Sequence, residues 1–405
     1  MEKGILKISQ NKKVSFLKTF KLFLVKLLLI SSFAYASSGF HGIASRHHIA
    51  TDIGLKVLKD GGNAIDAAVA VGFALSVVNP SAGNLGGGGF MLIHLSEKNE
   101  TIAIDYRERA PIQSSEKMFQ DQDGNVINGL SLNSTLASGV PGTVSGLFYV
   151  SEKFGLKNIQ SLIDPSIEVA KKGFVLSKFQ ANNLNKYKGK FLKNSEARET
   201  FTRPEGFEEG DVLVQKNLAN TLLRIAKNGK EEFYLGETAK KISSYYKKNN
   251  GILSFEDLKQ YELRLLKPVC GNCRVYKICS MPPPSSGGIA LIQMLNILEN
   301  LDIKKFQHNS EKYLMNLISA MDYAFFDRAK YLGDPDFFNV PQKLLISKQY
   351  AKDISIKIKN KEELQKIKIT VSESEETTHF SIVDKWGNAV SNTYTLNTAY
   401  GSGIV

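Results

Sequence analysis

A threonine that follows an acidic run is the residue with the clearest chemical potential in this chain. Residues 374–384 read SEETTHFSIVD, where glutamates give way at Thr377 to the alternating polar and apolar pattern of a β-strand. A threonine hydroxyl can act as a nucleophile when its own α-amino group, set free by cleavage of the preceding bond, is the general base. The sequence therefore predicts cleavage between Glu376 and Thr377 and an amide hydrolase with Thr377 as nucleophile; an ordinary threonine-rich strand is the alternative.

The α-amino group suits the role of base because of its pKa. An α-amino pKa of about 7.7–8.0 lies close to working pH, whereas a lysine amine would be mostly protonated there. The Thr377 hydroxyl could first attack the carbonyl carbon of Glu376, and hydrolysis of the resulting ester would release the amine. Processing and turnover would then use the same oxygen atom.

The last thirty residues predict a hairpin that places a second threonine near Thr377. Alternating segments flank a turn of sequence Lys-Trp-Gly-Asn. If Asp384 faces Ala389, Thr395 lies opposite Thr378, and a shift of one residue puts it opposite Thr377 instead. Opposed side chains are roughly 4.5–5.5 Å apart at Cβ. We therefore expect Thr395 beside Thr377 in either register.

Three other polar residues of the hairpin are candidates for the same site. The two-residue period of a strand predicts that Thr393 and Asn397 share the face of Thr395. His379 shares the face of Thr377, but a nucleophile that uses its own amine needs no histidine.

Arg107 is the candidate for binding substrate. It lies in the run DYRERAP at 105–111, after a predicted strand and before a proline, a position typical of a fixed loop at the edge of a cleft. A guanidinium group can bind a carboxylate through two parallel hydrogen bonds. A surface or ion-paired arginine is the alternative interpretation.

The glycine run at 86–89 invites a nucleotide-binding interpretation, which its context excludes. A P-loop would continue with Gly-Lys-Ser/Thr, whereas Phe90 follows here. A dinucleotide fingerprint follows a strand and opens a helix, whereas this run follows a predicted helix and opens a strand. The glycines instead predict close approach of the backbone to substrate or to a neighbouring segment.

The elements that must position these residues alternate between helical and strand patterns, which indicates a mixed α/β protein. Asn63 and Asp66 form a capping-box pattern, and residues 64–78 are apolar nearly all round, which predicts a deeply buried helix. Residues 90–95 and 101–106 predict a pair of strands. Further helices are predicted at 52–60, within 150–260, at 289–299 and around 321–328.

The composition is that of a soluble globular protein of 405 residues, 42% hydrophobic and 23% charged. Its net charge of +12 first suggests nucleic acid or an anionic membrane as partner. Residues 1–26 contain seven lysines and one glutamate and so supply +6, and the other +6 forms no basic stripe. No aromatic-basic motif accompanies the charge, so we expect no nucleic-acid partner.

The first 36 residues have the pattern of a secretory signal peptide. Lysines precede an apolar run at 22–30, which Lys26 interrupts, and Ala34-Tyr35-Ala36 fits a small-x-small cleavage site. The run is short for a bilayer-spanning helix, although an uncleaved anchor is the alternative. We therefore expect a periplasmic or secreted protein with no stable membrane anchor after signal removal.

Three cysteines, Cys270, Cys273 and Cys279, lie within ten residues. The first two have the spacing of a redox or metal motif, but no second pair supplies the remaining ligands of a structural zinc site. In an oxidising compartment two of the three could form a disulfide. We expect inert or bridged cysteines, no metal and no cofactor.

Seven segments resemble, in the same order, those of the γ-glutamyltransferase (glutathione hydrolase) family, and the match runs from about Gly39 to Val405. Any single segment is modest support, but the set as a whole identifies the chain as similar to that family. The segments are 61–68 (GGNAIDAA), 82–90 (AGNLGGGGF), 105–111 (DYRERAP), 282–288 (PPPSSGG), 331–336 (YLGDPD), 377–384 (TTHFSIVD) and 392–398 (NTYTLNT).

The resemblance implies an α/β (α+β) fold, the four-layer αββα sandwich of the N-terminal nucleophile hydrolases. With the signal pattern, it predicts a signal peptide at 1–36, a large subunit at 37–376 and the start of a small subunit at 377–405, the two subunits forming a heterodimer. The sandwich would be incomplete, because the resemblance implies a small subunit that continues well past Val405.

The resemblance also implies an activity. Thr377 would attack the γ-glutamyl amide of glutathione or another γ-glutamyl compound, and the acyl-enzyme would pass to water or to an amino-acid or peptide acceptor. Thr395 matches a second threonine that supports the nucleophile, Asn397 a residue near the γ-glutamyl group, and Arg107 the arginine that binds the α-carboxylate.

Two other interpretations stay open. A related N-terminal nucleophile acylase would act on a β-lactam or poly-γ-glutamate amide. Alternatively, the chain is a non-catalytic fragment: the resemblance puts the carboxylate for the substrate amine, a serine pair and the oxyanion-hole glycines past Val405. We therefore expect the 405-residue chain to be inactive on its own.

Overall fold

The structure is a computed structural model that describes residues 40–362, 364 and 377–405. The signal segment expected at 1–36 and Glu376 lie outside the described residues, so the signal peptide and the subunit boundary before Thr377 remain predictions. Within the described ranges, no helix combines the length and the apolar character needed to cross a membrane.

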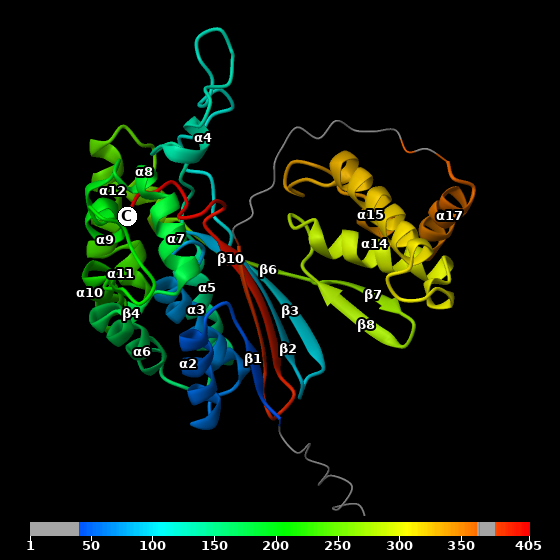
Figure 1. Cartoon of the computed structure of the whole chain (residues 1–405), viewed down its shortest axis with the longest axis horizontal. Helices are drawn as coiled ribbons and strands as arrows, with labels where there is room; N and C mark the ends of the chain where they lie inside the picture. Colours follow the sequence, from blue (N-terminus) through cyan, green and yellow to red (C-terminus); the bar gives the residue numbers. More distant parts are fainter. Residues whose placement is uncertain (1–39, 363, 365–376) are drawn as a thin grey trace, which may run out of the picture.

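A six-stranded antiparallel sheet forms the centre of the larger lobe (Figure 1). Its order is β1-β9-β10-β2-β3-β6, so the last two strands of the chain lie between two strands from its beginning. The predicted strand pair and the predicted hairpin are both present. The strands are β1 (Gly42–Ala44), β2 (Gly88–Leu95), β3 (Glu100–Asp105), β6 (Arg264–Leu266), β9 (Thr378–Val383) and β10 (Ala389–Thr395).

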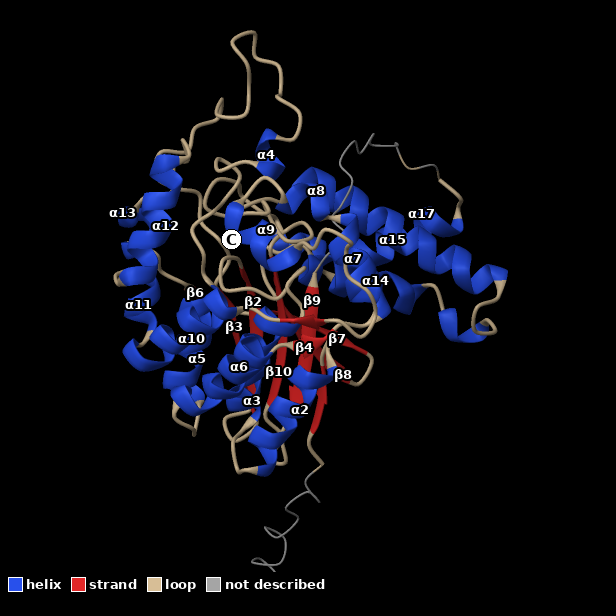
Figure 2. Cartoon of the chain, turned by 60° about the vertical axis from the view of Figure 1, so that its left-hand side comes forward, coloured by secondary structure: helices blue, strands red, loops and turns tan. Residues whose placement is uncertain are grey.

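Helix α3 (Ala64–Val78) occupies the core against one face of this sheet, as its apolar pattern predicts. All of its residues are buried, and Asn63 and Asp66 form the predicted capping box. The Tyr394 hydroxyl of β10 donates to the Gly72 carbonyl of α3 (2.8 Å). Helices α2, α5 and α6 pack around α3 (Figure 2).

The other helices of this layer complete the larger lobe, together with the short strands β4 (Phe174–Val175) and β5 (Val212–Leu213). Helices fill most of 150–260, as predicted. The helices of this lobe are α2 (His48–Lys59), α4 (Leu130–Asn133), α5 (Thr143–Phe154), α6 (Ile159–Lys172), α7 (Lys178–Lys186), α8 (Lys188–Phe191), α9 (Ser195–Phe201), α10 (Lys216–Asn228), α11 (Lys230–Tyr234), α12 (Glu237–Lys248) and α13 (Phe255–Lys259).

A smaller lobe lies on the other side of the sheet (Figure 1). The hairpin of β7 (Val269–Cys273) and β8 (Tyr276–Ser280) packs on α14 (Gly287–Asn300), which α15 and α17 cover. Cys270 and Cys279 face each other on the hairpin and form a disulfide, whereas Cys273 is a free thiol. The remaining elements are η1 (Ile303–Lys305), α15 (Glu311–Tyr331), α16 (Gln342–Leu345) and α17 (Lys348–Lys359).

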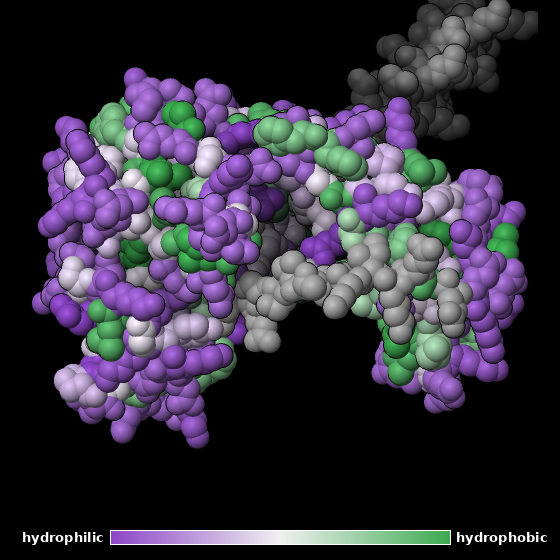
Figure 3. Space-filling model, turned by 90° about the horizontal axis from the view of Figure 1, so that it is seen from above, coloured by the Kyte–Doolittle hydropathy of each residue, from purple (hydrophilic) through white to green (hydrophobic). Residues whose placement is uncertain are grey.

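The sheet face opposite α3, called the outer face below, borders the hollow between the two lobes (Figure 3). Alternation along β9 defines it: Thr378 and Phe380 are buried against α3, whereas Thr377, His379 and Ser381 are exposed on the outer face.

Asp384 ties the end of β9 to the start of α3. Its Oδ2 accepts a hydrogen bond from the Ala64 amide (2.9 Å), and its Oδ1 accepts from the Trp386 and Asn388 amides (2.9 Å each). We expect Asp384→Ala to lower the free energy of unfolding by about 2–3 kcal/mol, because it leaves the buried Ala64 amide without its acceptor and removes the acceptor of two turn amides. Denaturant unfolding measures this loss. Asp384→Asn keeps an oxygen acceptor and should lose less, whereas unchanged stability of Asp384→Ala would contradict this role.

Candidate active site

The hairpin register places two threonines side by side. The β9–β10 ladder runs from Val383 opposite Ala389 to Thr378 opposite Tyr394. One step further along the same register, Thr377 lies opposite Thr395. The pairing of Asp384 with Ala389 is wrong, and the register shifted by one residue is observed. Asp384 instead closes the turn, where its amide donates to the Asn388 carbonyl (3.0 Å).

The glycine run lies on the other side of Thr395. Gly88 of β2 is opposite Thr395 in the β10–β2 ladder. A Cβ atom on Gly87 would lie 2.3 Å from the Thr395 carbonyl oxygen, and one on Gly88 would lie 2.5 Å from that of Tyr106. The glycines therefore permit close approach of neighbouring backbone, as predicted, and they allow β2 and the segment after β3 to crowd around the threonine pair.

Arg107 lies directly after β3, beside Gly88. A Cβ atom on Gly88 would lie 2.9 Å from the Arg107 carbonyl carbon. The Arg107 amide donates to Asp105 Oδ1 (2.9 Å), and its side chain is exposed. Gly88 is two strand spacings, roughly 10 Å, from Thr377. The structure thus brings Thr377, Thr395 and Arg107 to one end of the sheet.

Two carboxylates accompany Arg107. Burial raises the pKa of Asp105 and the pKa of Glu108 above their ordinary values, while the positive charge of Arg107 acts in the opposite direction on both. Arg107 therefore lies in a cluster of mixed charge. Glu108 was not predicted, because a charged run gives no sign of which carboxylate will have a shifted pKa.

Asn397 is near Thr395 for a different reason from the one predicted. Strand β10 ends at Thr395, and Asn397 has a positive φ of 71°, so strand alternation does not extend to it. Its amide instead donates to Thr395 Oγ1 (3.0 Å). The prediction of a shared strand face is wrong for Asn397, but the structure does bring its backbone to the Thr395 hydroxyl.

His379 bridges the two strands next to the threonine pair. Its Nδ1 is 2.7 Å from Thr393 Oγ1, and its Nε2 is 3.0 Å from Ser381 Oγ. Burial lowers the pKa of His379, which favours the neutral ring. Thr393 and His379 lie on the outer face as predicted, and both ring nitrogens are engaged by hydroxyl groups.

The segment 261–264, called the supporting segment below, contacts the loop of Arg107. The Tyr261 hydroxyl donates to the Arg107 carbonyl oxygen (2.9 Å), and Arg109 Nη2 donates to the Glu262 carbonyl oxygen (3.1 Å). Arg264 of β6 pairs with Asp105 of β3. No local pattern could have revealed these contacts, since about 150 residues separate the partners.

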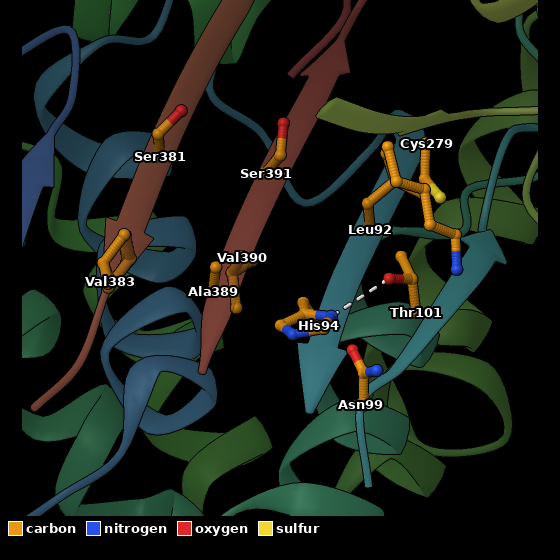
Figure 4. A pocket seen from close by; sticks show the side chains of 12 residues that line it. Leu92, His94, Asn99, Thr101, Cys279, Ser381, Val383, Ala389, Val390 and Ser391 are labelled. Carbon is orange, nitrogen blue, oxygen red and sulfur yellow. Dashed lines mark hydrogen bonds between the residues drawn. The ribbon is translucent and has the colours of Figure 1, made fainter. Parts of the chain in front are cut away.

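A cavity of about 510 Å³ opens on the outer face, further along the strands from Thr377 (Figure 4). Its walls include Ser381, Ser391, Leu92 and Thr101 from the sheet and Cys279 from β8. Thr377, Thr395 and Arg107 are not among its lining residues. The cavity therefore lies between the lobes and apart from the threonine pair.

Comparison with known proteins identifies the family. The sequence profile described as Gamma-glutamyltranspeptidase matches residues 50–405. The chain belongs to this family. Among curated gamma-glutamyltranspeptidase relatives, the glutathione hydrolase proenzyme of Escherichia coli (strain K12) is 46% identical over 370 residues. That alignment covers 90% of this chain and 64% of the relative, so the chain spans about 64% of the relative's length.

Solved structures agree with this membership. The crystal structure of Helicobacter pylori gamma-glutamyltranspeptidase is similar, with a TM-score of 0.76 and 47% identity over 78% of this chain and 90% of that chain. The crystal structure of cephalosporin acylase from Bacillus halodurans has a TM-score of 0.76 and 25% identity over 90% of this chain and 67% of that chain. These likenesses confirm the predicted fold class of the N-terminal nucleophile hydrolases, to which this chain contributes the six-stranded sheet and its helical layer.

Proposed function

We propose that this chain carries the nucleophile of a γ-glutamyltransferase, or glutathione hydrolase, made as a self-cleaving precursor. The supporting observation is the gathering of Thr377, Thr395 and Arg107 at one end of the sheet in a gamma-glutamyltranspeptidase family member. Relatives that share this region carry the name glutathione hydrolase proenzyme. Because the chain aligns with 64% of their length, the proposed activity is that of the complete protein.

Self-cleavage would come first. The Thr377 hydroxyl oxygen adds to the Glu376 carbonyl carbon, the carbon–nitrogen bond breaks, and the nitrogen takes up the proton lost by the hydroxyl and becomes the α-amino group of Thr377. Water then hydrolyses the ester and leaves a carboxylate on Glu376. Thr395 Oγ1 accepts a hydrogen bond from the Asn397 amide, so any hydrogen bond that this hydroxyl donates uses its own proton.

Turnover would reuse the same oxygen. The Thr377 amine takes the hydroxyl proton as the oxygen attacks the γ-glutamyl carbonyl carbon, and that proton passes to the departing amine. The resulting γ-glutamyl ester passes to water, which yields glutamate, or to the amine of an amino acid or peptide, which yields a new γ-glutamyl amide. The two products of self-cleavage would stay together as a heterodimer.

Arg107 would bind the α-carboxylate of the γ-glutamyl donor. We expect Arg107→Lys to raise KM about 10-fold with little change in kcat, because lysine keeps the charge but loses the two-point hydrogen bond. Steady-state kinetics with γ-glutamyl-p-nitroanilide measures this change. Arg203, which pairs with Asp211 elsewhere on the surface (2.8 Å), offers the matched control, since Arg203→Lys should leave KM unchanged. Equal KM values for Arg107→Lys and the parent would contradict the role of Arg107.

The second candidate function is that of an acylase, which the likeness to cephalosporin acylase favours. The two functions are separated by comparing kcat/KM of the complete protein for γ-glutamyl-p-nitroanilide and for an acyl β-lactam. We expect the γ-glutamyl compound to be preferred, because Arg107 suits a donor with an α-carboxylate. A preference for the β-lactam would overturn the glutathione hydrolase proposal.

We also propose that the protein works outside the cytoplasm, in the periplasm or medium. The signal-like sequence at 1–36 supports this proposal. The Cys270–Cys279 disulfide is also typical of an oxidising compartment. Fractionation of cells that express the complete protein tests it, and activity confined to the cytoplasm would contradict it.

A further inference from the structure

The position of Arg107 depends on a residue far away in the sequence. Arg107 lies just beyond β3, between Tyr106, whose backbone still pairs with Gly89, and Arg109, whose backbone pairs with Val140. Its carbonyl oxygen accepts a hydrogen bond from the Tyr261 hydroxyl (2.9 Å), at a sequence separation of 154 residues. The hydrogen bond therefore adds to these backbone pairs a contact on the carbonyl of the peptide between Arg107 and Glu108, whose orientation affects where the guanidinium group can reach.

We propose that Tyr261 is a positioning residue for Arg107: its hydroxyl holds the peptide after Arg107 so that the guanidinium group meets the α-carboxylate of the donor. The inference rests on the proposed function, in which Arg107 binds that carboxylate. Tyr261 itself acts through the Arg107 backbone, on the side of the loop that faces the supporting segment.

The Tyr261 ring is held firmly enough for this task. It stacks on the Tyr234 ring, with centroids 5.7 Å apart and planes 13° from parallel. Tyr234 is fixed in turn, because its hydroxyl donates to the Pro141 carbonyl (2.9 Å) and accepts from the Ser145 amide (3.1 Å). A Cβ atom on Gly142 would lie 2.0 Å from the Tyr261 hydroxyl oxygen, so a glycine at this position leaves room for that hydroxyl.

The hydroxyl remains a donor throughout the working pH range. Burial raises the pKa of Tyr261 well above its ordinary value, and the nearby tyrosine and carboxylate charges act in the same direction. A tyrosinate would lack the proton that the Arg107 carbonyl accepts. The hydrogen bond from the Tyr261 hydroxyl to the Arg107 carbonyl should therefore persist at every pH at which the Thr377 amine is active.

The chain offers a matched pair of variants for the test. Tyr261→Phe removes the hydroxyl that contacts Arg107, whereas Tyr234→Phe removes the neighbouring hydroxyl of the same stack, which is hydrogen-bonded to Pro141 and Ser145. In the complete protein, we expect Tyr261→Phe to raise KM for γ-glutamyl-p-nitroanilide about 3- to 10-fold with kcat within about 2-fold. Tyr234→Phe keeps the ring stack and the Tyr261–Arg107 hydrogen bond, so it should raise KM less than Tyr261→Phe does. Equal KM increases in both variants, or none in Tyr261→Phe, would overturn the proposal.

Two further measurements separate positioning from general damage. In an Arg107→Ala background, Tyr261→Phe should have no additional effect on KM, because both changes act on one interaction. Amide hydrogen exchange of residues 106–110 should be faster in Tyr261→Phe than in Tyr234→Phe, and this reading needs no activity. If exchange is faster in Tyr261→Phe but the parent protein does not cleave γ-glutamyl compounds, the proposed function is refuted, while the conclusion that Tyr261 stabilises the Arg107 loop stands. Active protein with unchanged exchange and KM would refute the positioning role alone.

Discussion

Replacement of Thr377 by alanine should leave the complete protein as a single uncut chain without γ-glutamyl hydrolase activity. Both steps of the proposed mechanism use the Thr377 hydroxyl oxygen, so the alanine variant lacks the attacking atom for cleavage and for turnover. We expect kcat to fall by at least about 10⁴-fold, the order of loss seen when a catalytic nucleophile is removed. A denaturing gel reports the uncut chain, and release of p-nitroaniline reports turnover.

The neighbouring threonine provides the control for this variant. Thr378 is buried on the opposite face of β9, and its Oγ1 has no hydrogen-bond partner among the described residues. Thr378→Val keeps the shape of the side chain and should cleave normally, while Thr377→Ser keeps a hydroxyl and should retain partial activity. Two fragments from Thr377→Ala, with the second beginning at residue 377, would refute Thr377 as the processing nucleophile.

Substitution of Gly88 by alanine should damage both activity and stability. The added Cβ would lie 2.5 Å from the Tyr106 carbonyl oxygen and 2.8 Å from the Glu108 amide nitrogen, both of them backbone atoms that cannot rotate away. The loop of Arg107 must therefore move relative to Thr395, the residue opposite Gly88. A shift of about 1 Å at a reacting centre can cost about 10²-fold, so we expect kcat/KM to fall by that order.

Gly88→Ala should also lower the free energy of unfolding by about 1–3 kcal/mol, the usual cost of overpacking. Gly86 provides a control within the same run, because it is exposed and a Cβ there would meet no atom of the described residues within 4 Å. Gly86→Ala should keep kcat/KM within about 2-fold. Wild-type kinetics and stability for Gly88→Ala would show that the close approach at this glycine is unimportant.

Local sequence patterns predicted the helices and strands of this fold more securely than the register in which the strands pair. The capping box of Asn63 and Asp66 and the apolar run that follows it lie next to one another in sequence, so α3 could be predicted from the sequence alone. The hairpin register was less certain, because it depends on how the turn closes. The Asp384 side chain accepts from turn amides and from Ala64, which takes this residue out of the ladder and shifts every pair by one.

The candidate site also contains residues that could be predicted from the sequence and residues that could not. Thr377, Thr395 and Arg107 could be selected because each lies at a recognisable junction of the sequence. The end of β10 was not predictable. Because the strand stops at Thr395, Asn397 contacts Thr395 through its backbone amide, from a left-handed conformation, and not by sharing a strand face. The contact of Tyr261 with Arg107 requires the whole fold, because it joins segments 154 residues apart.

The strand order sets a sequence of events for maturation. β9 and β10 lie between β1 and β2, so a cut before Thr377 would leave two polypeptides that contribute alternating parts of one sheet. If the chain is cut there, the sheet would form more readily before the cut, when its strands belong to one chain and need not find each other by diffusion. After the cut, refolding would require two separate molecules to meet and interleave, so its rate would depend on protein concentration. Processing would thus make unfolding difficult to reverse: the precursor would fold readily as one chain, whereas the cleaved enzyme would recover poorly after denaturation.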